Sequence, residues 1–472
     1  MIHNRDSIHT NCWHISEKLT KAQVFPTDSG AAPGQAPFRI SPTPFSLDPA
    51  TFEFLHKLGP ALLDFYRATN TLYRRSRTNE HLRWVTDYLN LGKTERVINY
   101  GRMNRFRHDL PLVIRPDIIP TETGFVITEL DAVPGGMGLL AALNHAYSTL
   151  GYDVIGGPYG MIDSFRESLK HVADQEEPVV AIAVSDESQD YQPEMCWLAE
   201  RLTERGLRTH QVHPRDLIFQ ESGLYAYDER VDVLYRFFEL FDLPNIPKID
   251  LVLYAIRKEL LRITPPLKSY LEEKLIMGLF HNPRLSSFWH SNLKGEHLSL
   301  LNRVFPKTWI LDPTPLPNYA VIPGLTLNGQ ALAHWSELKG ASRRQRNFVI
   351  KPSGFSELAW GSRGVVVGND VNNEEWSDAI DDALKAFGDT PHILQEFHKG
   401  KKFKIAYYDF GRQKQETMVA RARLCPYYFV LGDTVQLAGV LATLCPSDKK
   451  IIHGMTDAVM TASTVMSTDI RS

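Results

Sequence analysis

The sequence contains few of the features that would assign it at once to a class of protein. It has only four cysteines among 472 residues, Cys12, Cys196, Cys425 and Cys445, with no Cys-x-x-Cys pair and no metal-ligand spacing. Its formal net charge of -3 gives no overall electrostatic attraction for nucleic acid. It has no run of about 18 apolar residues that could cross a membrane, and no signal-peptide core at its N-terminus. We therefore expect reduced, buried thiols and a cytoplasmic protein with neither nucleic acid nor membrane as a partner.

Two common nucleotide-binding motifs are also missing. The apolar run over residues 177–186 is typical of a buried parallel strand, and the helix and strand expected after it predict a right-handed crossover unit. No Gly-x-Gly-x-x-Gly follows that strand, so a dinucleotide site is not expected there. No helix with Gly-Lys-Ser/Thr follows the glycine-bearing loop near residue 354, which excludes a Walker loop.

The N-terminal part of the chain changes character near Asp48. Residues 1–45 are rich in Ser, Thr, Pro and Gly, and residues 30–37 are linker-like, so we expect a disordered arm. From Asp48 onward apolar residues recur at helical spacing, and a second helix is expected over residues 81–91. Packed on a sheet, these helices would form a helical cap.

A β-hairpin is expected over residues 112–131. Two apolar, β-branched runs flank the turn Thr121-Glu-Thr-Gly124, and Gly124 suits the left-handed position that closes a three-residue loop with a bulge. In that turn Thr121 pairs with Phe125. The Gly-Gly-Met-Gly sequence over residues 135–138 would let the backbone approach a ligand closely.

This register would gather four charged side chains on one face of the hairpin. Asp117 would lie opposite Glu129, and Arg115 opposite Asp131, with all four on the same side of the pleat. Neighbouring carboxylates raise one another's pKa unless a cation joins them, so the cluster suits a hard divalent ion such as Mg2+. The alternative is that these charges are simply solvated on an outer face.

A lysine and a glycine-bearing loop follow more than 200 residues later. The strand over residues 347–351 ends at Lys351, and Gly354, Gly361 and Gly364 lie in the loop before the chain returns as a strand. Backbone N–H groups of such a loop can cradle phosphate oxygens while the lysine supplies a mobile charge. A solvated lysine at a strand end is the alternative.

Two further strands carry candidate side chains. One ends in Gln395, Glu396 and Phe397. The other, over residues 420–430, places Arg421 and Arg423 on the same face because side chains two apart share a face of a strand. Surface charges are the alternative explanation for the two arginines.

The order of these elements resembles that of an ATP-grasp ligase. Ile350-Lys351-Pro with its glycine loop, followed by Leu394-Gln395-Glu396-Phe397, is similar to the nucleotide-binding half of that fold. There a lysine touches the phosphates and a short hinge strand accepts the adenine amino group. ATP-grasp enzymes normally carry a Glu-x-Asn metal pair after this half, but residues 441–460 contain none.

The carboxylates lie upstream instead, as Arg115-x-Asp117 and Glu129-x-Asp131. This order resembles the circularly permuted ATP-grasp ligases, in particular the synthetase half of glutathionylspermidine synthetase. The resemblance implies that Asp117 and Glu129 are magnesium ligands, that Asp131 stands where the family has Asn, and that Arg115 lies near the reacting acyl phosphate. It also implies that Lys274 is a second nucleotide-contacting lysine.

The resemblance covers most of residues 95–435, with two departures. Asp131 adds a negative charge to the metal site, and the loop over residues 353–363 is longer than the family's and contains Trp360. No amidase-like second domain is recognisable. The identity of the substrates is therefore not inherited from the family.

The expected fold is mixed α/β, an ATP-grasp fold in permuted order with a Rossmann-like domain and a helical cap. The expected segments are a disordered arm (1–45), the helical cap (46–95), the metal-binding hairpin with part of the core (96–175), the Rossmann-like domain (176–265), a helical connection (266–345) and the nucleotide-binding lobe (346–472).

The function this implies is ATP-dependent ligation of a carboxylate to an amine through an acyl phosphate, with ATP and Mg2+ as cofactors. Arg115 and one of Arg421 or Arg423 would stabilise the oxyanion of the tetrahedral intermediate. The substrates would be small molecules, an amino acid, peptide or polyamine, and a homodimer is compatible with this hypothesis. The alternatives are an ATP-binding sensor or scaffold without ligase activity, and a phosphotransferase on the same fold.

Overall fold

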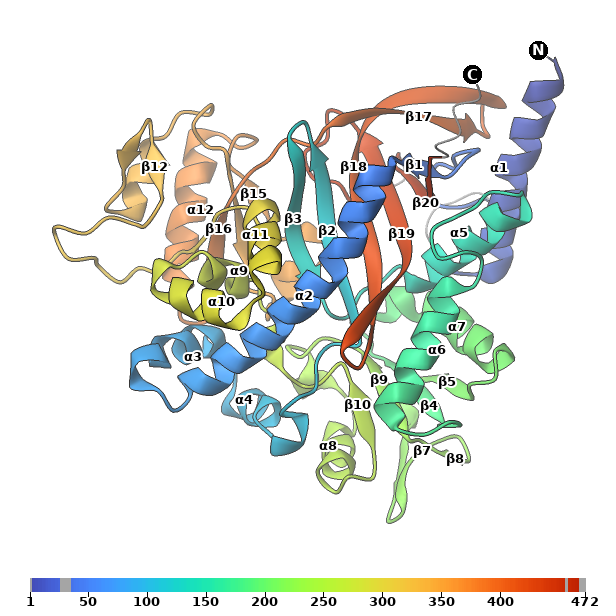
Figure 1. Ribbon diagram of the computed structural model, residues 1–472, viewed down its shortest axis with the longest axis horizontal. Coiled ribbons are helices and arrows are strands. Elements are labelled where there is room, and N and C mark those ends of the chain that lie inside the picture. Colours follow the sequence, from blue (N-terminus) through green and yellow to red (C-terminus); the bar gives the residue numbers. More distant parts are fainter. Residues whose placement is uncertain (1, 26–34, 455–456, 467–472) are drawn as a thin grey trace.

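The computed structural model describes residues 2–25, 35–454 and 457–466, which fold into three larger sheets with helices packed on them (Figure 1). The fold is mixed α/β, as the sequence predicts. The helices are α1 (Ile2–Ala22), α2 (Pro49–Ser76), α3 (Arg83–Asn90), α4 (Glu95–Gly101), α5 (Met137–Thr149), α6 (Gly160–Ala173), α7 (Gln192–Glu204), α8 (Ile249–Arg257), α9 (Leu275–Phe280), α10 (Ser286–Asn292), α11 (Gly295–Val304) and α12 (Asn373–Lys385).

A seven-stranded sheet forms the centre of the molecule. Its strands pair in the order β1 (Phe45–Leu47), β20 (Val459–Val465), β19 (Thr434–Pro446), β18 (Lys414–Leu431), β2 (Val113–Thr121) and β3 (Gly124–Asp131), and β17 (Lys402–Asp409) also pairs with β18. All pairs are antiparallel except β1 with β20. The two hairpins β2–β3 and β18–β19, far apart in sequence, are therefore joined through β18 and β2.

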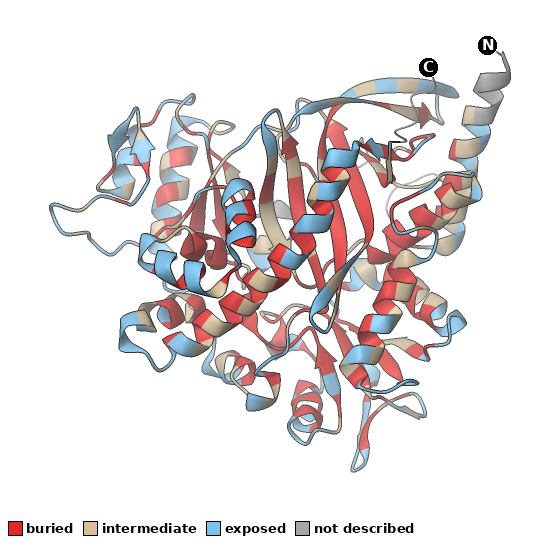
Figure 2. Cartoon of the chain, viewed as in Figure 1, coloured by how far each residue is buried: buried red, intermediate tan, exposed pale blue. Residues whose placement is uncertain are grey.

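Both faces of this sheet are buried in its middle, as the red strands of Figure 2 show. Alternate residues of β18 enter different cores because side chains of a strand point to opposite faces. Leu424 packs in the core that includes α2, whereas Cys425 packs in the core that includes α5 and α6. Helix α2 thus covers one face, and α5 and α6 cover the other.

Helix α2 begins where the sequence first shows helical spacing. The Asp48 side chain accepts a hydrogen bond of 2.8 Å from the Thr51 backbone N–H, and Pro49 stands at the first helical position. An N-cap carboxylate and a proline at this position both favour a helix start. The helix then runs along the central sheet and contacts β18 and β19.

A second sheet of four parallel strands contains the crossover unit expected from the sequence. Its order is β10 (Arg262–Thr264), β9 (Val233–Phe237), β4 (Val180–Val184) and β5 (Thr209–Val212). Every residue of β4 and β9 is buried, which explains their continuous apolar runs. A small antiparallel sheet, β6 (Ile218–Gln220), β7 (Gly223–Ala226) and β8 (Glu229–Arg230), lies between β5 and β9 in sequence.

The third sheet carries the lysine and the hinge strand. Its antiparallel order is β11 (Thr308–Ile310), β16 (His392–Glu396), β14 (Phe348–Pro352) and β15 (Val366–Val367), and a two-stranded ribbon, β12 (Thr326–Leu327) and β13 (Gln330–Ala331), precedes β14 in sequence. Helix α12 packs on β14, with a capping box between Asn372 and Glu375 at its start. The glycine loop joins β14 to β15.

The prediction of a disordered arm over residues 1–45 was wrong, because helix α1 spans Ile2–Ala22. Cys12, Ile15 and Leu19 recur on one side of it and are buried, and the helix packs against α5. Their helical spacing is the signal that the polar composition of the segment masked. Part of the linker-like stretch, residues 30–34, lies outside the described residues.

The hairpin turn is also corrected. Thr121 pairs with Gly124 and not with Phe125, so the turn has two residues. A β-bulge then shifts the register between Asp117 and Ile118 by one residue, which brings Asp117 opposite Glu129 as predicted. The predicted charged pairs are confirmed although the predicted turn was wrong. The actual turn is one residue shorter, and the bulge places one extra residue on β3, so the two differences cancel.

Candidate active site

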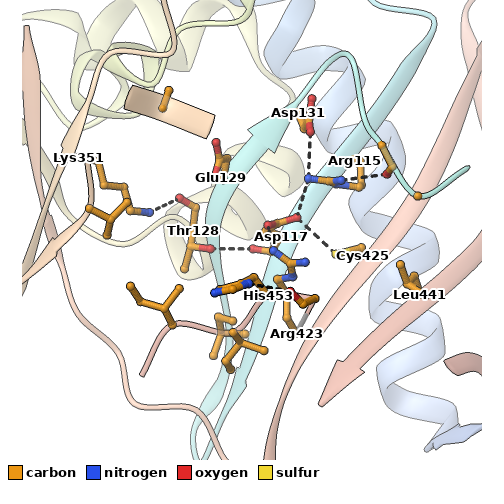
Figure 3. A pocket seen from close by; sticks show the side chains of 18 of the residues that line it. Arg115, Asp117, Thr128, Glu129, Asp131, Lys351, Arg423, Cys425, Leu441 and His453 are labelled. Carbon is orange, nitrogen blue, oxygen red and sulfur yellow. Dashed lines mark hydrogen bonds and ion pairs between the residues drawn. The ribbon is translucent and has the colours of Figure 1, made fainter. Parts of the chain in front are cut away.

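A cavity of about 1020 Å3 lies between the central sheet, the sheet that carries Lys351 and the carboxyl end of strand β9 (Figure 3). Most of the residues predicted for the site line it. They are Arg115, Asp117, Glu129, Asp131, Lys274, Lys351, Gly354, Gln395, Glu396, Phe397, Arg421 and Arg423. Gly364 does not line it, and Gly361 lies outside the residues whose surroundings the structure describes.

Asp117 lies between two guanidinium groups at the centre of this cavity. One of its carboxylate oxygens is 2.9 Å from Arg423 Nη1, and the other is 3.2 Å from Arg115 Nη2. The same Arg115 nitrogen lies 2.9 Å from Asp131 Oδ2. Since Arg423 is on β18 and Arg115 on β2, the pairing of these strands brings the group together.

The electrostatics of this group follow from its burial. Burial alone would raise the pKa of Asp117, but Arg115 and Arg423 hold that pKa below its usual range. Burial raises the pKa of Asp131, only partly opposed by Arg115, and Glu129 adds to the rise. Asp117 is therefore the firmly ionised member, and its main contacts orient the two arginines.

The β-bulge of the hairpin has a direct effect on Lys351. Thr128 is the extra residue on β3, because Ile118 pairs with Ile127 and Asp117 pairs with Glu129. The Thr128 carbonyl accepts a hydrogen bond of 2.8 Å from Lys351 Nζ. Gln395 on the neighbouring strand accepts a second, of 2.9 Å, so the ammonium is held between two sheets.

Burial lowers the pKa of Lys351 to about 8, partly opposed by Glu129. Its two hydrogen-bond acceptors are neutral oxygens, and an ammonium has three donors. A second lysine pairs with Glu129, with Lys274 Nζ 3.0 Å from Glu129 Oε1. Two lysines thus flank this carboxylate on one wall of the cavity.

The two arginines of the cavity retain unused donors. The Nε–H groups of Arg115 and Arg423 are buried and have no hydrogen-bond acceptor among the described residues. A buried donor without an acceptor costs roughly 1–3 kcal/mol, so such groups are most often satisfied by a ligand or water.

The predicted metal ligands do not form a metal site on their own. Within the described part of the chain, no group of three or more His, Cys, Asp or Glu side chains converges as metal ligands. Near the hairpin the side chains comprise three carboxylates, Asp117, Glu129 and Asp131, and four cations, Arg115, Arg423, Lys274 and Lys351. This donor set fits Mg2+ brought in together with a polyphosphate, because Mg2+ is usually held by one or two carboxylates and substrate phosphates.

The predicted arginines differ in their contacts. Arg423 contacts Asp117, whereas Arg421 donates to the backbone carbonyls of Gly400, Ser447 and Lys449. Arg421 thus ties together two loops at the edge of the cavity. Both arginines line the cavity, and Arg423 is the one that contacts a hairpin carboxylate.

On the hinge strand, the backbone N–H groups of Glu396 and Phe397 donate to Lys307 O and Asn347 O. The Gln395 side-chain amide donates a hydrogen bond of 3.2 Å to the Thr308 hydroxyl, and its oxygen accepts one from Lys351. Gln395 therefore acts as a bridge that positions Lys351, and any contact of this strand with an adenine amino group would fall to backbone carbonyls.

Sequence reasoning missed a buried network at the root of the glycine loop. Glu273 and Lys93, whose side chains are fully buried, form an ion pair of 2.7 Å. Glu273 also accepts hydrogen bonds from the Ser353 hydroxyl at 2.6 Å and the Gly354 N–H at 3.0 Å. Burial favours a raised pKa, but Lys93, Ser353 and Gly354 together lower the pKa of Glu273. The loop is thus anchored to residues far away in the sequence.

Two further carboxyls that line the cavity, Glu239 and Glu272, were also missed. Glu239 follows the carboxyl end of β9, and burial, with Glu272 and Asp131 nearby, raises its pKa to about 8. Glu272 pairs with the buried Arg236. The available signal was the position of Glu239 just after a parallel strand, where ligands bind in α/β sheets.

Glu194 on α7 was missed as well. Its carboxyl accepts hydrogen bonds from the backbone N–H groups of Gly136 and Leu139 at the start of α5. Burial raises the pKa of Glu194 to about 7, although these two bonds oppose the rise. The side chain holds the glycine turn that follows the hairpin against the wall of the cavity.

Comparisons with known proteins define the fold. No family model matches the sequence, and no curated protein matches it. A glutathione synthetase-like effector from Globodera pallida superposes with a TM-score of 0.60 at 12% identity, over 97% of each chain. A putative gamma-glutamylcysteine synthetase from Methylobacillus flagellatus KT aligns with a TM-score of 0.38 at 11% identity, over 76% of this chain and 81% of that one. No helix in the described ranges is both long and apolar enough to span a bilayer.

Identity this low leaves the residues of the cavity to be argued from their own geometry. The superposition extends over nearly the whole of both chains. The chain therefore has the mixed α/β fold of a glutathione synthetase-like protein.

Proposed function

We propose that the protein is an ATP-dependent carboxylate–amine ligase that forms an amide through an acyl phosphate. One observation carries the proposal: a cationic wall and a group of carboxylates converge on a single cavity in a synthetase-like fold. We further propose that the chain is a circularly permuted ATP-grasp protein divided into the six segments expected from the sequence. Its small-molecule substrates and any homodimer belong to the same proposal.

The wall with Lys351 and Lys274 is suited to the phosphates of ATP. Both lysines flank Glu129, and the glycine loop that begins at Gly354 follows Lys351 directly. Phosphoryl transfer needs its oxygens positioned and their charge neutralised, which two lysines would supply. Mg2+ would add charge neutralisation there, held by Glu129 and Asp131 with phosphate oxygens.

The two arginines are suited to the reacting carboxylate. A carboxylate oxygen attacks the γ-phosphorus, ADP leaves, and the amine then attacks the carbonyl carbon to release phosphate. Negative charge develops on the carbonyl oxygen in that second step. Arg115 and Arg423, which line the cavity and are oriented by Asp117, would stabilise it.

The acidic end of the cavity is suited to the amine. An amine arrives as an ammonium ion at neutral pH and must lose a proton before it attacks. Glu239, with a pKa raised to about 8 by burial and by Glu272 and Asp131, matches a proton acceptor at that pH.

The test is ADP release with a panel of carboxylates and amines that includes amino acids, short peptides and polyamines. The proposal expects ADP release that requires both partners and yields an amide. Glu129→Gln should abolish metal-dependent turnover, and Glu239→Gln should raise KM for the amine while the affinity for a non-hydrolysable ATP analogue is kept. The exposed Glu122→Gln, at the tip of the same hairpin, is the matched control and should change neither.

Three other outcomes would point elsewhere. Binding of the ATP analogue without ADP release from any pair would leave a nucleotide-binding sensor or scaffold. A stable phosphorylated product with no amide would indicate a phosphotransferase. Turnover by Glu129→Gln at the normal rate would reject the assignment of this carboxylate to the metal.

A further inference from the structure

A second hollow, of about 110 Å3, lies away from the large cavity and shares no lining residue with it. It is formed where the ends of α2 and α4 meet the short helical turn Ser269–Leu271. The rings of Tyr73 and Tyr270 stack at one side of it, with their centroids 3.8 Å apart.

The charged side chains that line this hollow are all cationic. They are Arg74, Arg77, Arg102, Arg107 and Lys268. Among the described residues, no Asp or Glu forms an ion pair with any of these five side chains. Arg102 donates to the Tyr73 hydroxyl at 3.2 Å, a neutral partner. Like charges gathered this closely repel one another, so the arrangement needs a source of negative charge.

Helix ends account for only part of this charge. Arg74 belongs to the last turn of α2, and cations are favoured there because a helix C-terminus carries roughly half a negative charge. The end of α4 adds about the same amount. Two helix ends together offset about one positive charge, while the hollow has five cationic side chains, and Arg107 and Lys268 belong to neither helix.

Lys268 gives a second, independent indication of a ligand. Its side chain is buried, with 1% of the residue exposed, and Nζ donates to Asn70 Oδ1 at 2.9 Å and to Asp109 O at 2.7 Å. Both acceptors are neutral and an ammonium has three donors, which leaves one for the hollow. Burial lowers the pKa of Lys268 to about 7. Asp109 opposes this shift, and the positive charge of Arg74 adds to it. Asp109 offsets only part of the cost of burying this ammonium, and an anion in the hollow would offset more of it.

We propose that this hollow binds a phosphate-sized oxyanion, either inorganic phosphate or the phosphoryl group of a small metabolite. Its volume of about 110 Å3 has room for one tetrahedral group. Planar guanidinium groups bind two phosphate oxygens at once, and several of them surround this space. Arg77 and Arg107 are exposed at its rim, so the rest of a larger ligand would extend into solvent.

The test is isothermal titration with inorganic phosphate, and separately with phosphoserine, at constant ionic strength. The test variant is Arg77→Gln with Arg107→Gln, since both side chains are exposed and their loss leaves the packing intact. The control is Arg75→Gln with Arg303→Gln, which removes the same charge from exposed positions outside the hollow. Arg75 stacks over Phe288 instead.

The expected result is one binding site in the native protein, weakened at least about tenfold in the test variant and less than about twofold in the control. Binding of phosphoserine but not phosphate would identify a metabolite's phosphoryl group as the ligand. Absence of binding by both anions would overturn the proposal. Equal affinity in the test variant would also overturn it, because the anion would then bind elsewhere, such as in the large cavity.

Discussion

The ion pair between Glu273 and Lys93 makes a sharp prediction about the glycine loop. The perturbation is Glu273→Gln, which keeps the size of the side chain and removes its charge. The native carboxylate has four contacts at hydrogen-bond distance: Lys93, Ser353, and the backbone N–H groups of Gly354 and Leu275. In the variant, Lys93 would remain buried without a carboxylate partner, in contact with the Leu91 carbonyl and the ring of Phe355.

The magnitude follows from the burial of both side chains, which are 0% exposed. Removing one partner of a buried ion pair costs about 3–5 kcal/mol, because the other charge stays uncompensated. Ser353→Ala removes a single hydrogen bond to the same carboxylate and should cost about 1 kcal/mol. Lys93→Met combined with Glu273→Met leaves no lone charge and should cost less than Glu273→Gln alone.

The assay is amide hydrogen exchange of the loop, followed at Gly354, whose N–H is held by Glu273. A loss of 3 kcal/mol corresponds to about a hundredfold faster exchange through local opening, since 1.4 kcal/mol is a factor of ten. Lys93 holds the pKa of Glu273 down against the effect of burial, so this protection should be present above about pH 4.5 and be lost at lower pH.

Two results would refute this reasoning. Exchange at Gly354 that is less than tenfold faster in Glu273→Gln would mean that the ion pair does not anchor the loop. A double methionine variant that is less stable than the single variant would mean that the cost comes from packing and not from an uncompensated charge.

Three other predictions concern titration and coupling. Burial lowers the pKa of Lys351 to about 8, so the affinity for an ATP analogue should fall by up to about tenfold per pH unit above pH 8. Calorimetry would measure this fall, and the variant Lys351→Arg should not show it. Burial raises the pKa of Glu194 to about 7, so its contribution to folding stability is present below about pH 4.5 and lost as pH rises through 7. Glu194→Gln should flatten the dependence of thermal stability on pH over that window. An unchanged profile would reject this role. Phosphate in the basic hollow should slow hydrogen exchange over residues 268–274, because this segment joins Lys268 to Glu272 and Lys274, which line the large cavity. An unaffected exchange rate would mean that the two hollows are uncoupled.

Much of the fold could be predicted because its signals are local. The spacing of apolar residues after Asp48 gave helix α2, and the continuous apolar run near residue 180 gave the buried strand β4. The alternation of charges at Arg115, Asp117, Glu129 and Asp131 placed these side chains on one face of the hairpin, although the turn itself was mispredicted. Helix α1 was missed because its polar composition outweighed the spacing of its three buried apolar residues.

By itself, the sequence determined the order of the elements, the charged face of the hairpin and the position of Lys351 at a strand end. These features depend on neighbours in the chain and on the geometry of single elements. Only the tertiary structure decided which distant side chains meet. Asp117 contacts Arg423 across 306 positions, and Lys93 contacts Glu273 across 180. Such contacts depend on how sheets and helices pack, and a linear pattern has no signal for packing. For the same reason, the five cations of the second hollow appear as unrelated surface charges in the sequence and as one site in the folded chain.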